Sequence, residues 1–349
     1  MPTYKTALVM IARNEARCIA RSLRSLRPWV DQMIVLDTGS TDDTATIARN
    51  EGAQVHHFAW VDDFAAARNA ALALSQADWN IVVDADETLS EGGEVLKMLA
   101  QQAPNFVGRI DVNSNFLSNS DIPPQTSSTW IPRVLPSGIY YKGSIHEQPI
   151  FSLSCIDLDV HLHHDGYMPE QMQAKGARNQ KLLEIAIQTA PDDAYLQYQL
   201  GKDHEVHDRF NAACDAYEKA LRLCPLNRAY RHDLVVRTLF ALKQANRLPD
   251  AIHLAESEMP NWQHSADFFF TLGDVLLSYA VTHPDEAEAL LPMIESCWTR
   301  CLEIGDNPVL DGAVHGRGSH LAAHNLMLFY DSLGLTAKAD LYKLATQPR

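Results

Sequence analysis

The 349-residue sequence lacks the marks of several common classes of protein. Its six cysteines include no CxxC pair, and only Cys297 and Cys301 lie close together, at a spacing that favours packing in a helical core over a zinc site or a disulfide. No stretch reaches the roughly 18 uninterrupted apolar residues of a membrane-spanning helix. The first residues lack a basic segment followed by an apolar run and a small-residue cleavage site. We therefore expect a protein without a transmembrane segment, in a reducing cytoplasm.

A basic region is absent as well. The net charge is −15, and the excess of acid is even: residues 1–168 hold 12 Lys and Arg against 20 Asp and Glu, and residues 169–349 hold 17 against 24. With no basic half, tail or stripe, nucleic acid is not expected as a partner. A phosphorylated ligand stays compatible with this charge if a metal ion or backbone amides offset the phosphate.

The chain does contain two regions with different hydrophobic periodicities, and its length suggests two domains. Up to residue 103, short apolar runs alternate with helical patterns. We expect strands over 6–12, 33–37, 54–58 and 79–86, and helices over 15–26, after the turn at 38–41, and over 64–77. This alternation predicts an α/β domain with a mixed, mostly parallel sheet covered on both faces. In such sheets, ligands bind beyond the carboxyl ends of the strands.

The second region is helical. After an irregular, β-rich stretch, the strand patterns end near residue 169. Pro191, Pro225 and Pro260 then recur at intervals of 34 and 35 residues, within an order of small and aromatic residues that resembles tetratricopeptide repeats. The sequence therefore predicts one domain over residues 1–168 and an all-helical repeat domain over residues 169–349.

Three carboxylates follow a predicted buried strand in the segment NIVVDADETLS at 80–90. On a strand, Asp84 and Asp86 would point the same way, so both carboxylates could face one ligand. Two such carboxylates repel each other and stay ionised only with a cation or strong donors between them. Mg²⁺ and Mn²⁺ accept carboxylates and complete their shells with substrate phosphate oxygens. The alternative is a helix start here, in which Asp86 or Glu87 caps the helix or lies in the turn before Ser90 and Glu91.

Other polar residues follow neighbouring strands, so we expect them on the same rim. Asp37 could accept a hydrogen bond from the imide N–H of uracil or from ribose hydroxyls, or it could accept from backbone amides of the turn that follows it. Arg68 could reach a phosphate or a base, or it could pair with Asp63 or Asp84. The backbone of the segment ARNEAR and its Glu15 could frame a nucleoside.

Taken in order, these segments resemble the family-2 glycosyltransferases, whose catalytic domain has the GT-A fold. The matching segments are MIARNE (10–15), IVLDTGSTDDT (34–44), WVDDFAAARNAAL (60–72), IVVDADE (81–87), WIPRVL and YYKGSIHEQ (within 130–148) and HDGY (164–167). The helical repeats resemble those that follow the transferase domain in a subgroup of bacterial enzymes. The resemblance implies a nucleotide-diphosphate sugar donor, a divalent metal (Mn²⁺ or Mg²⁺) held by the D-x-D motif, and inversion at the anomeric carbon.

The resemblance also implies roles for individual residues. The donor site would be formed by Ala12, Arg13, Asn14, Glu15, Asp37, Arg68, Asp84, Ala85 and His146. The metal would be bound by Asp86 and His164, with Asp84 close to the metal or to the ribose. His161 and His163 compete with His164, because Asp165 stands where the family more often has an aromatic residue. Glu147 is the candidate general base that takes the proton of the acceptor, with a surface or salt-bridged glutamate as the alternative.

These expectations favour a metal-dependent, inverting glycosyltransferase that uses a nucleotide-diphosphate sugar, with UDP-sugar favoured, and a protein, glycan or lipid-linked glycan acceptor. The alternative is a scaffold or binding protein in which the repeats act and the transferase domain is degenerate. A nucleotidyltransferase would share the sheet and the carboxylates, but it usually has a Gly-rich or basic triphosphate loop, and MIARNEARC contains neither glycine nor lysine. The repeats would bind the acceptor or a partner, or support a homodimer, with a purely structural brace as the alternative.

Overall fold

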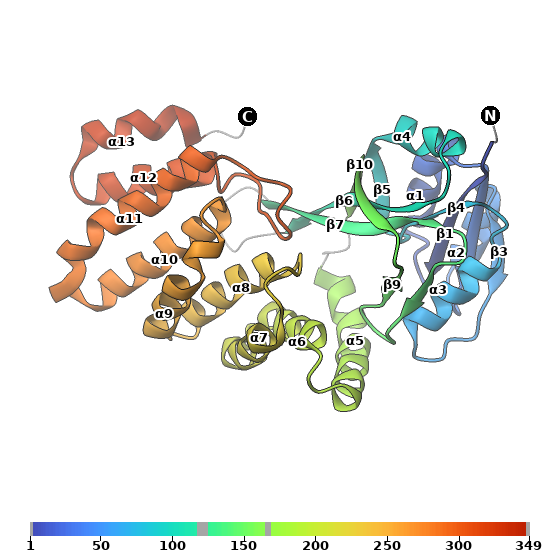
Figure 1. Ribbon diagram of the computed structural model, residues 1–349, viewed down its shortest axis with the longest axis horizontal. Helices are drawn as coiled ribbons and strands as arrows, with labels where there is room; N and C mark the ends of the chain where they lie inside the picture. The colour runs from blue at the N-terminus through green and yellow to red at the C-terminus, as the bar shows by residue number, and fades with distance from the viewer. Residues whose placement is uncertain (1–2, 117–124, 165–168, 347–349) are drawn as a thin grey trace. The chain divides into compact units, whose positions relative to one another are not determined.

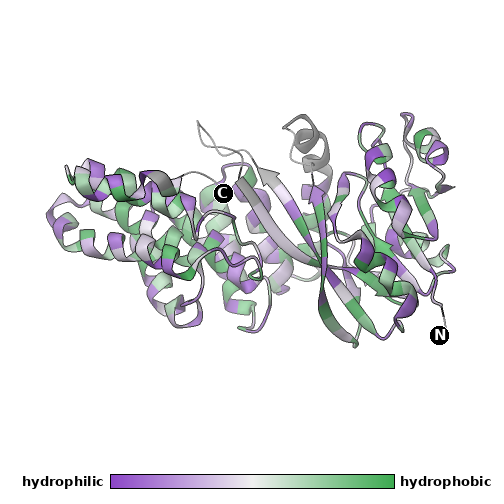
Figure 2. Cartoon of the chain, turned by 90° about the horizontal axis from the view of Figure 1, so that it is seen from above, coloured by the Kyte–Doolittle hydropathy of each residue, from purple (hydrophilic) through white to green (hydrophobic). Residues whose placement is uncertain are grey.

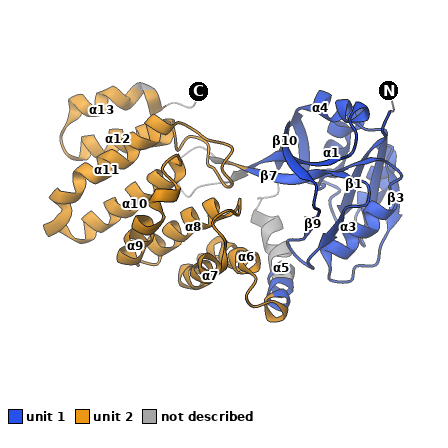
Figure 3. Cartoon of the chain, in the orientation of Figure 1, with its two compact units in different colours: residues 1–124, 129–186 blue, residues 125–128, 187–349 orange. Residues whose placement is uncertain are grey.

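The computed structural model describes residues 3–116, 125–164 and 169–346. The chain forms two compact units: unit 1 takes residues 1–124 and 129–186, and unit 2 takes residues 125–128 and 187–349 (Figure 3). The boundary predicted after residue 168 lies outside the described residues and stays a prediction. The compact units separate near the end of helix α5 (Pro169–Thr189).

An eight-stranded sheet forms the centre of unit 1 in the described residues, with the order β3-β2-β1-β4-β7-β6-β10-β5 (Figure 1). Its strands are β1 (Thr6–Ala12), β2 (Gln32–Asp37), β3 (Gln54–His57), β4 (Trp79–Val82), β5 (Glu87–Glu91), β6 (Phe106–Phe116), β7 (Gln125–Pro136) and β10 (Ser154–His164). Strands β1 to β4 are mutually parallel and β6 is parallel to β10, whereas β7 is antiparallel to β4 and β5 to β10. A separate antiparallel pair consists of β8 (Tyr140–Lys142) and β9 (Gln148–Ile150). The predicted mixed, mostly parallel sheet is confirmed.

Both faces of this sheet are covered, because alternate residues of a buried strand pack into different clusters. In β1, Leu8 and Met10 join one apolar core, whereas Ala7 and Val9 join another. The helices of this unit are α1 (Ile19–Leu26), α2 (Thr44–Asn50), α3 (Phe64–Ala73) and α4 (Gly93–Met98), with 3₁₀ turns η1 (Arg27–Trp29) and η2 (Leu99–Gln101). Helix α1 packs its apolar stripe into the first core, and Ala71 of α3 packs into the second. The α/β arrangement of the GT-A class predicted from the sequence is therefore present.

Unit 2 is built from pairs of helices. They are α6 (Ala194–Val206), α7 (Phe210–Leu223), α8 (Arg231–Gln244), α9 (Leu248–Glu258), α10 (Ala266–Thr282), α11 (Pro284–Ile304), α12 (His320–Ser332) and α13 (Thr336–Tyr342), with 3₁₀ turns η3 (Met259–Asn261) and η4 (Lys343–Thr346). Glycines allow close crossings within pairs: a Cβ on Gly201 would lie 2.2 Å from the ring of Tyr217, and one on Gly273 would lie 2.6 Å from Trp298. The predicted all-helical repeat region is confirmed.

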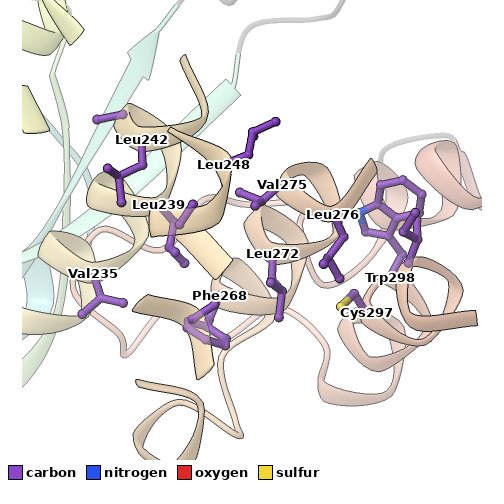
Figure 4. Packing of buried hydrophobic residues seen from close by; sticks show 14 of the residues in the cluster. Val235, Leu239, Leu242, Leu248, Phe268, Leu272, Val275, Leu276, Cys297 and Trp298 are labelled. Carbon is purple, nitrogen blue, oxygen red and sulfur yellow. The ribbon is translucent and has the colours of Figure 1, made fainter. Parts of the chain in front are cut away.

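One continuous apolar core runs through these helices (Figure 4). Leu239 of α8, Leu272 of α10 and Trp298 of α11 are all buried in it. Cys297 lies in the same core, and Cys301 is buried nearby as a free thiol, so the packing interpretation of this cysteine pair is confirmed.

Polar and apolar residues interleave along the helices (Figure 2). Over the described ranges, no helix combines the length and the apolar character that crossing a bilayer requires. The cytoplasmic location stays a prediction.

Candidate active site

Three adjacent parallel strands end in register at one edge of the sheet. Ala12 of β1 pairs with Asp37 of β2, and Asp37 pairs with His57 of β3. Each of these residues is the last of its strand. The rim expected at the carboxyl ends of the strands is therefore present, and it brings together residues that are far apart in the sequence.

The loop after β1 packs against the loop after β2. Asn14, at φ 57°, donates its N–H to Ser40 Oγ over 2.9 Å, and its Oδ1 accepts from Thr41 N over 2.8 Å. Arg13 and Asn14 are exposed on this rim, whereas Glu15 is buried and accepts a hydrogen bond from Cys18 Sγ over 3.2 Å. The exposed backbone of the loop can thus border a nucleoside, whereas the buried Glu15 side chain stabilises the loop through its hydrogen bond with Cys18.

Asp37 is buried, and both of its carboxylate oxygens have donors. Its Oδ1 accepts from Ser40 N at 3.0 Å, and its Oδ2 lies 3.1 Å from His57 Nδ1. The predicted turn contact of Asp37 with the Ser40 amide is therefore confirmed, whereas the contact with His57 was not predicted. Strand register was the signal that could have found it, because His57 lies near the end of the strand predicted over 54–58, beside the end of the strand that carries Asp37.

The D-x-D motif does not lie on a strand, so one premise of the sequence analysis was wrong. Strand β4 ends at Val82, Asp84 and Asp86 occupy a turn, and β5 begins at Glu87. The carboxylates of Asp84 and Asp86 consequently have different partners. The helix-cap alternative was wrong as well, because a strand and not a helix follows the turn. The buried Ala85 separates the two carboxylates.

Asp84 lies between two arginines. Arg68 Nη2 donates to Asp84 Oδ1 over 2.8 Å, and Arg133 Nη2 donates to Oδ2 over 2.8 Å. Arg133 also donates to Glu87 Oε1 over 2.9 Å, and Glu87 Oε2 accepts from the backbone N–H of Asp84 over 2.8 Å. Burial alone would raise the pKa of Asp84, but Arg133 and Arg68 hold it well below its usual range. Asp63 instead accepts from Ala66 N at the start of α3.

Glu147 joins the same network. Its carboxylate accepts a hydrogen bond from Arg68 Nε, and both side chains are about nine-tenths buried. Gly143 and His146 shape the loop that presents it, both at positive φ, and the guanidinium of Arg68 lies 5.6 Å from the ring centre of Tyr141. The proposed base and the first aspartate of the D-x-D motif are therefore held by one arginine.

Three polar atoms around this network have no hydrogen-bond partner among the described residues. They are Arg68 Nη1, Arg133 Nε and Tyr141 Oη, all on buried side chains. Buried donors of this kind usually have a partner, so their presence together favours a ligand with acceptor oxygens at this position. Arg133 is not among the residues predicted for the site, although an arginine inside the apolar run WIPRVLP was a usable signal.

Asp86, the second aspartate of the turn, lies close to His164 at the end of β10. Asp86 Oδ2 is 3.6 Å from His164 Nε2. Burial would lower the pKa of His164, but the carboxylate of Asp86 and the nearby carboxylates of Glu87 and Asp84 raise it above its ordinary value. Of the competing histidines, His161 is 3.1 Å from Asp111 and 3.0 Å from Asp159, and strand alternation turns the neighbouring histidine, His163, away from the face of His164. Asp165 and the remainder of HDGY lie outside the described residues.

The described residues supply only some of the ligands that a divalent metal ion needs. Within the described ranges, no three His, Cys, Asp or Glu side chains converge to hold an ion. Arg68 and Arg133 place two positive charges against the Asp84 carboxylate, which opposes a cation there, so the Asp86 carboxylate and the His164 imidazole are the candidate ligands. Such a site suits an ion that takes one or two protein ligands and completes its shell with phosphate oxygens.

Comparison with known families agrees with this geometry. Residues 7–125 match the model of glycosyl transferase family 2. The N-terminal part of the chain is a family-2 glycosyltransferase domain. The match covers the loops after β1 and β2 and the D-x-D turn, and the resemblance stated from the sequence is confirmed.

Relatives extend the likeness beyond the family-2 domain. The chain is 31% identical over 218 residues to a tetratricopeptide repeat-containing protein of Synechococcus elongatus, covering 56% of this chain and 51% of that protein. It is 24% identical over 264 residues to the prophage-derived glycosyltransferase SunS of Bacillus subtilis, covering 72% of this chain and 62% of that protein. The chain thus spans about half to three-fifths of these relatives. A structure of glucosyl-3-phosphoglycerate synthase from Mycobacterium tuberculosis aligns over 32% of this chain and 44% of that chain, at 24% identity and a TM-score of 0.27.

Proposed function

We propose that this protein is a metal-dependent, inverting glycosyltransferase that uses a UDP-sugar as donor. The observation that carries the proposal is the position of Arg68, which binds Asp84 of the D-x-D turn and the candidate base Glu147 at once. In a family-2 domain, this arrangement joins the donor side and the acceptor side of one reaction centre. A degenerate domain serving as a scaffold would have no need to keep this buried ionic network, which is costly to maintain.

The donor would be held along the rim. Asp37 would accept the imide N–H of uracil, and the loop of Arg13 and Asn14 would border the nucleoside. Arg68 Nη1 and Arg133 Nε are buried and have no partner within the described residues, so a shift of these side chains toward the rim would let them donate to phosphate oxygens. Asp84 would orient both arginines and contact the ribose.

Asp86 and His164 would bind Mn²⁺ or Mg²⁺, which when bound would neutralise charge on the leaving diphosphate. Glu147 would take the proton from the acceptor nucleophile as it attacks from the face opposite the diphosphate. Movement of Arg68 toward a phosphate would release Glu147 for that task. His146 and Ala85 would border the sugar. The helical repeats would bind the acceptor or a partner protein through their surface.

Thermal unfolding with UDP and metal tests the donor and metal assignments. UDP together with Mn²⁺ should raise the melting temperature, because a ligand at 100 times its Kd adds about 2.7 kcal/mol of stability, while either alone should do much less. Asp86→Asn should remove the metal-dependent increase, and the control Asp157→Asn, which changes a carboxylate that pairs with Arg109, should keep it. Equal stabilisation by UDP without metal would reject metal dependence. No response to any nucleotide would favour the scaffold alternative.

A further inference from the structure

The edge of the donor rim carries a histidine that the proposed function does not use. His57 ends the edge strand β3 and is the register partner of Asp37. Its Nδ1 lies 3.1 Å from Asp37 Oδ2, and its Nε2 lies 3.1 Å from Arg49 Nη2. The His57 side chain is 64% exposed, whereas that of Asp37 is 4% exposed, so the histidine reaches the buried carboxylate from the solvent side.

The two contacts determine which ring nitrogen carries the proton. A guanidinium has donors and no acceptor, so His57 Nε2 must accept from Arg49. The proton of the neutral ring is then on Nδ1, which donates to Asp37 Oδ2. Arg49, His57 and Asp37 thus form a directed chain of hydrogen bonds that ends on the carboxylate.

We propose that His57 is a positioning residue that orients Asp37 for recognition of a uracil base, an inference that rests on the proposed use of a UDP-sugar. Ser40 N holds Oδ1 and His57 Nδ1 holds Oδ2, so the carboxylate plane is fixed at both ends. Each oxygen retains a lone pair, because a carboxylate has about four acceptor positions. The fixed carboxylate can accept one further N–H from a base placed over the rim.

This arrangement distinguishes bases by their hydrogen-bond pattern. Uracil presents an N3–H donor, which a carboxylate accepts. Cytosine presents an acceptor lone pair at N3, which the same carboxylate repels. A site built to accept a hydrogen bond rejects a ligand that cannot donate it. This selectivity depends on the orientation of the carboxylate, because a carboxylate free to rotate forms a weaker hydrogen bond with the correct base.

Calorimetric titration of the full chain with UDP and CDP in the presence of Mn²⁺ tests this role. The two nucleotides share ribose, diphosphate and metal, so the ratio of their Kd values reports the base alone. His57→Gln places its amide at the ε position and loses the contact with Asp37, whereas His57→Asn keeps a donor at the δ position of Nδ1. His56→Asn, which changes the exposed neighbour on the same strand, is the matched control.

We expect His57→Gln to weaken UDP binding about tenfold, because the Asp37 carboxylate, once free to rotate, loses most of its hydrogen bond with the uracil N3–H. CDP binding should be unchanged, because cytosine lacks this donor. His57→Asn should restore most of the UDP affinity, and His56→Asn should behave as wild type. Thermal unfolding of each variant checks that the fold is retained. A wild-type UDP to CDP ratio in His57→Gln would overturn the positioning role while leaving the proposed function intact. Failure of the wild-type chain to bind UDP would overturn both.

Discussion

Replacing Arg133 with methionine should destabilise unit 1 strongly, because this one guanidinium pairs with two carboxylates, of which Glu87 is buried. The side chain of Arg133 is 8% exposed, and its partners Glu87 and Asp84 are 4% and 31% exposed. Removing one partner of a buried ion pair typically costs about 3–5 kcal/mol. Asp84 keeps Arg68 and is partly solvated, so its loss is small, and the main cost comes from Glu87. We therefore expect Arg133→Met to lower the free energy of unfolding by about 3 kcal/mol.

Urea unfolding at pH 7, followed by tryptophan fluorescence, measures this change. The control is Arg109→Met, whose guanidinium pairs with the exposed Asp157 and whose loss should cost less than about 1 kcal/mol. In the double variant Arg133→Met/Glu87→Gln, the buried charge is gone, so about 1–2 kcal/mol should return. The network would be refuted if Arg133→Met lowered the free energy of unfolding no more than Arg109→Met does. It would also be refuted if the effects of Arg133→Met and Glu87→Gln on that free energy simply added in the double variant.

Two further predictions concern the sheet and the repeats. Burial would lower the pKa of His161, but hydrogen bonds to Asp159 and Asp111 raise it. The protonated His161 therefore stabilises the fold below the unfolded pKa of about 6.5, and this stabilisation is lost as the pH rises through the pKa of the folded state. His161→Gln should therefore cost about 1 kcal/mol at pH 5.5 and less at pH 8.5 in urea titrations, and an equal cost at both pH values would contradict this. Gly201→Ala should lower the free energy of unfolding by about 1–3 kcal/mol, because the new Cβ would lie 2.2 Å from a Tyr217 ring atom. The control is Glu256→Ala at an exposed position. A decrease for Gly201→Ala no larger than that for Glu256→Ala would argue against the close crossing of the two helices.

The layout of the sheet could be predicted because hydrophobic periodicity reports burial. The expected strand 6–12 coincides with β1, and the strands expected over 33–37 and 54–58 match β2 and β3 to within one residue. Parallel strands buried on both faces appear as continuous apolar runs, which are easy to locate. The same logic placed Asp37 and the D-x-D motif on one rim.

The pairing of charges could not be predicted, because it depends on contacts between distant segments. The strand expected over 79–86 ends at Val82. Val83 is apolar as well, so the apolar pattern could not show that the chain leaves the sheet there and turns. Arg133 is 46 residues from Glu87 in the sequence and 49 from Asp84, so nothing local linked them. Motif resemblance named Asp86 and His164 together, and the structure places the two side chains 3.6 Å apart, but the motif did not show that Asp84 pairs with Arg68 and Arg133.

The repeats were predicted by their spacing and their small residues. Gly201 and Gly273 lie at equivalent crossings in α6 and α10, and each faces a large aromatic ring of the next helix. What these helices bind is not encoded in that pattern, because it records packing between helices.

Donor turnover tests the central claim most directly. Wild-type protein should release UDP from at least one sugar in a panel of UDP-sugars when Mn²⁺ or Mg²⁺ is present, and chelation should stop the release. Glu147→Gln should lower the rate by about 100-fold or more while UDP binding stays near the wild-type value, and the exposed control Glu94→Gln should retain full activity. Release of UDP by Glu147→Gln at the wild-type rate would contradict the role of the base. Absence of release from every UDP-sugar would contradict the account as a whole.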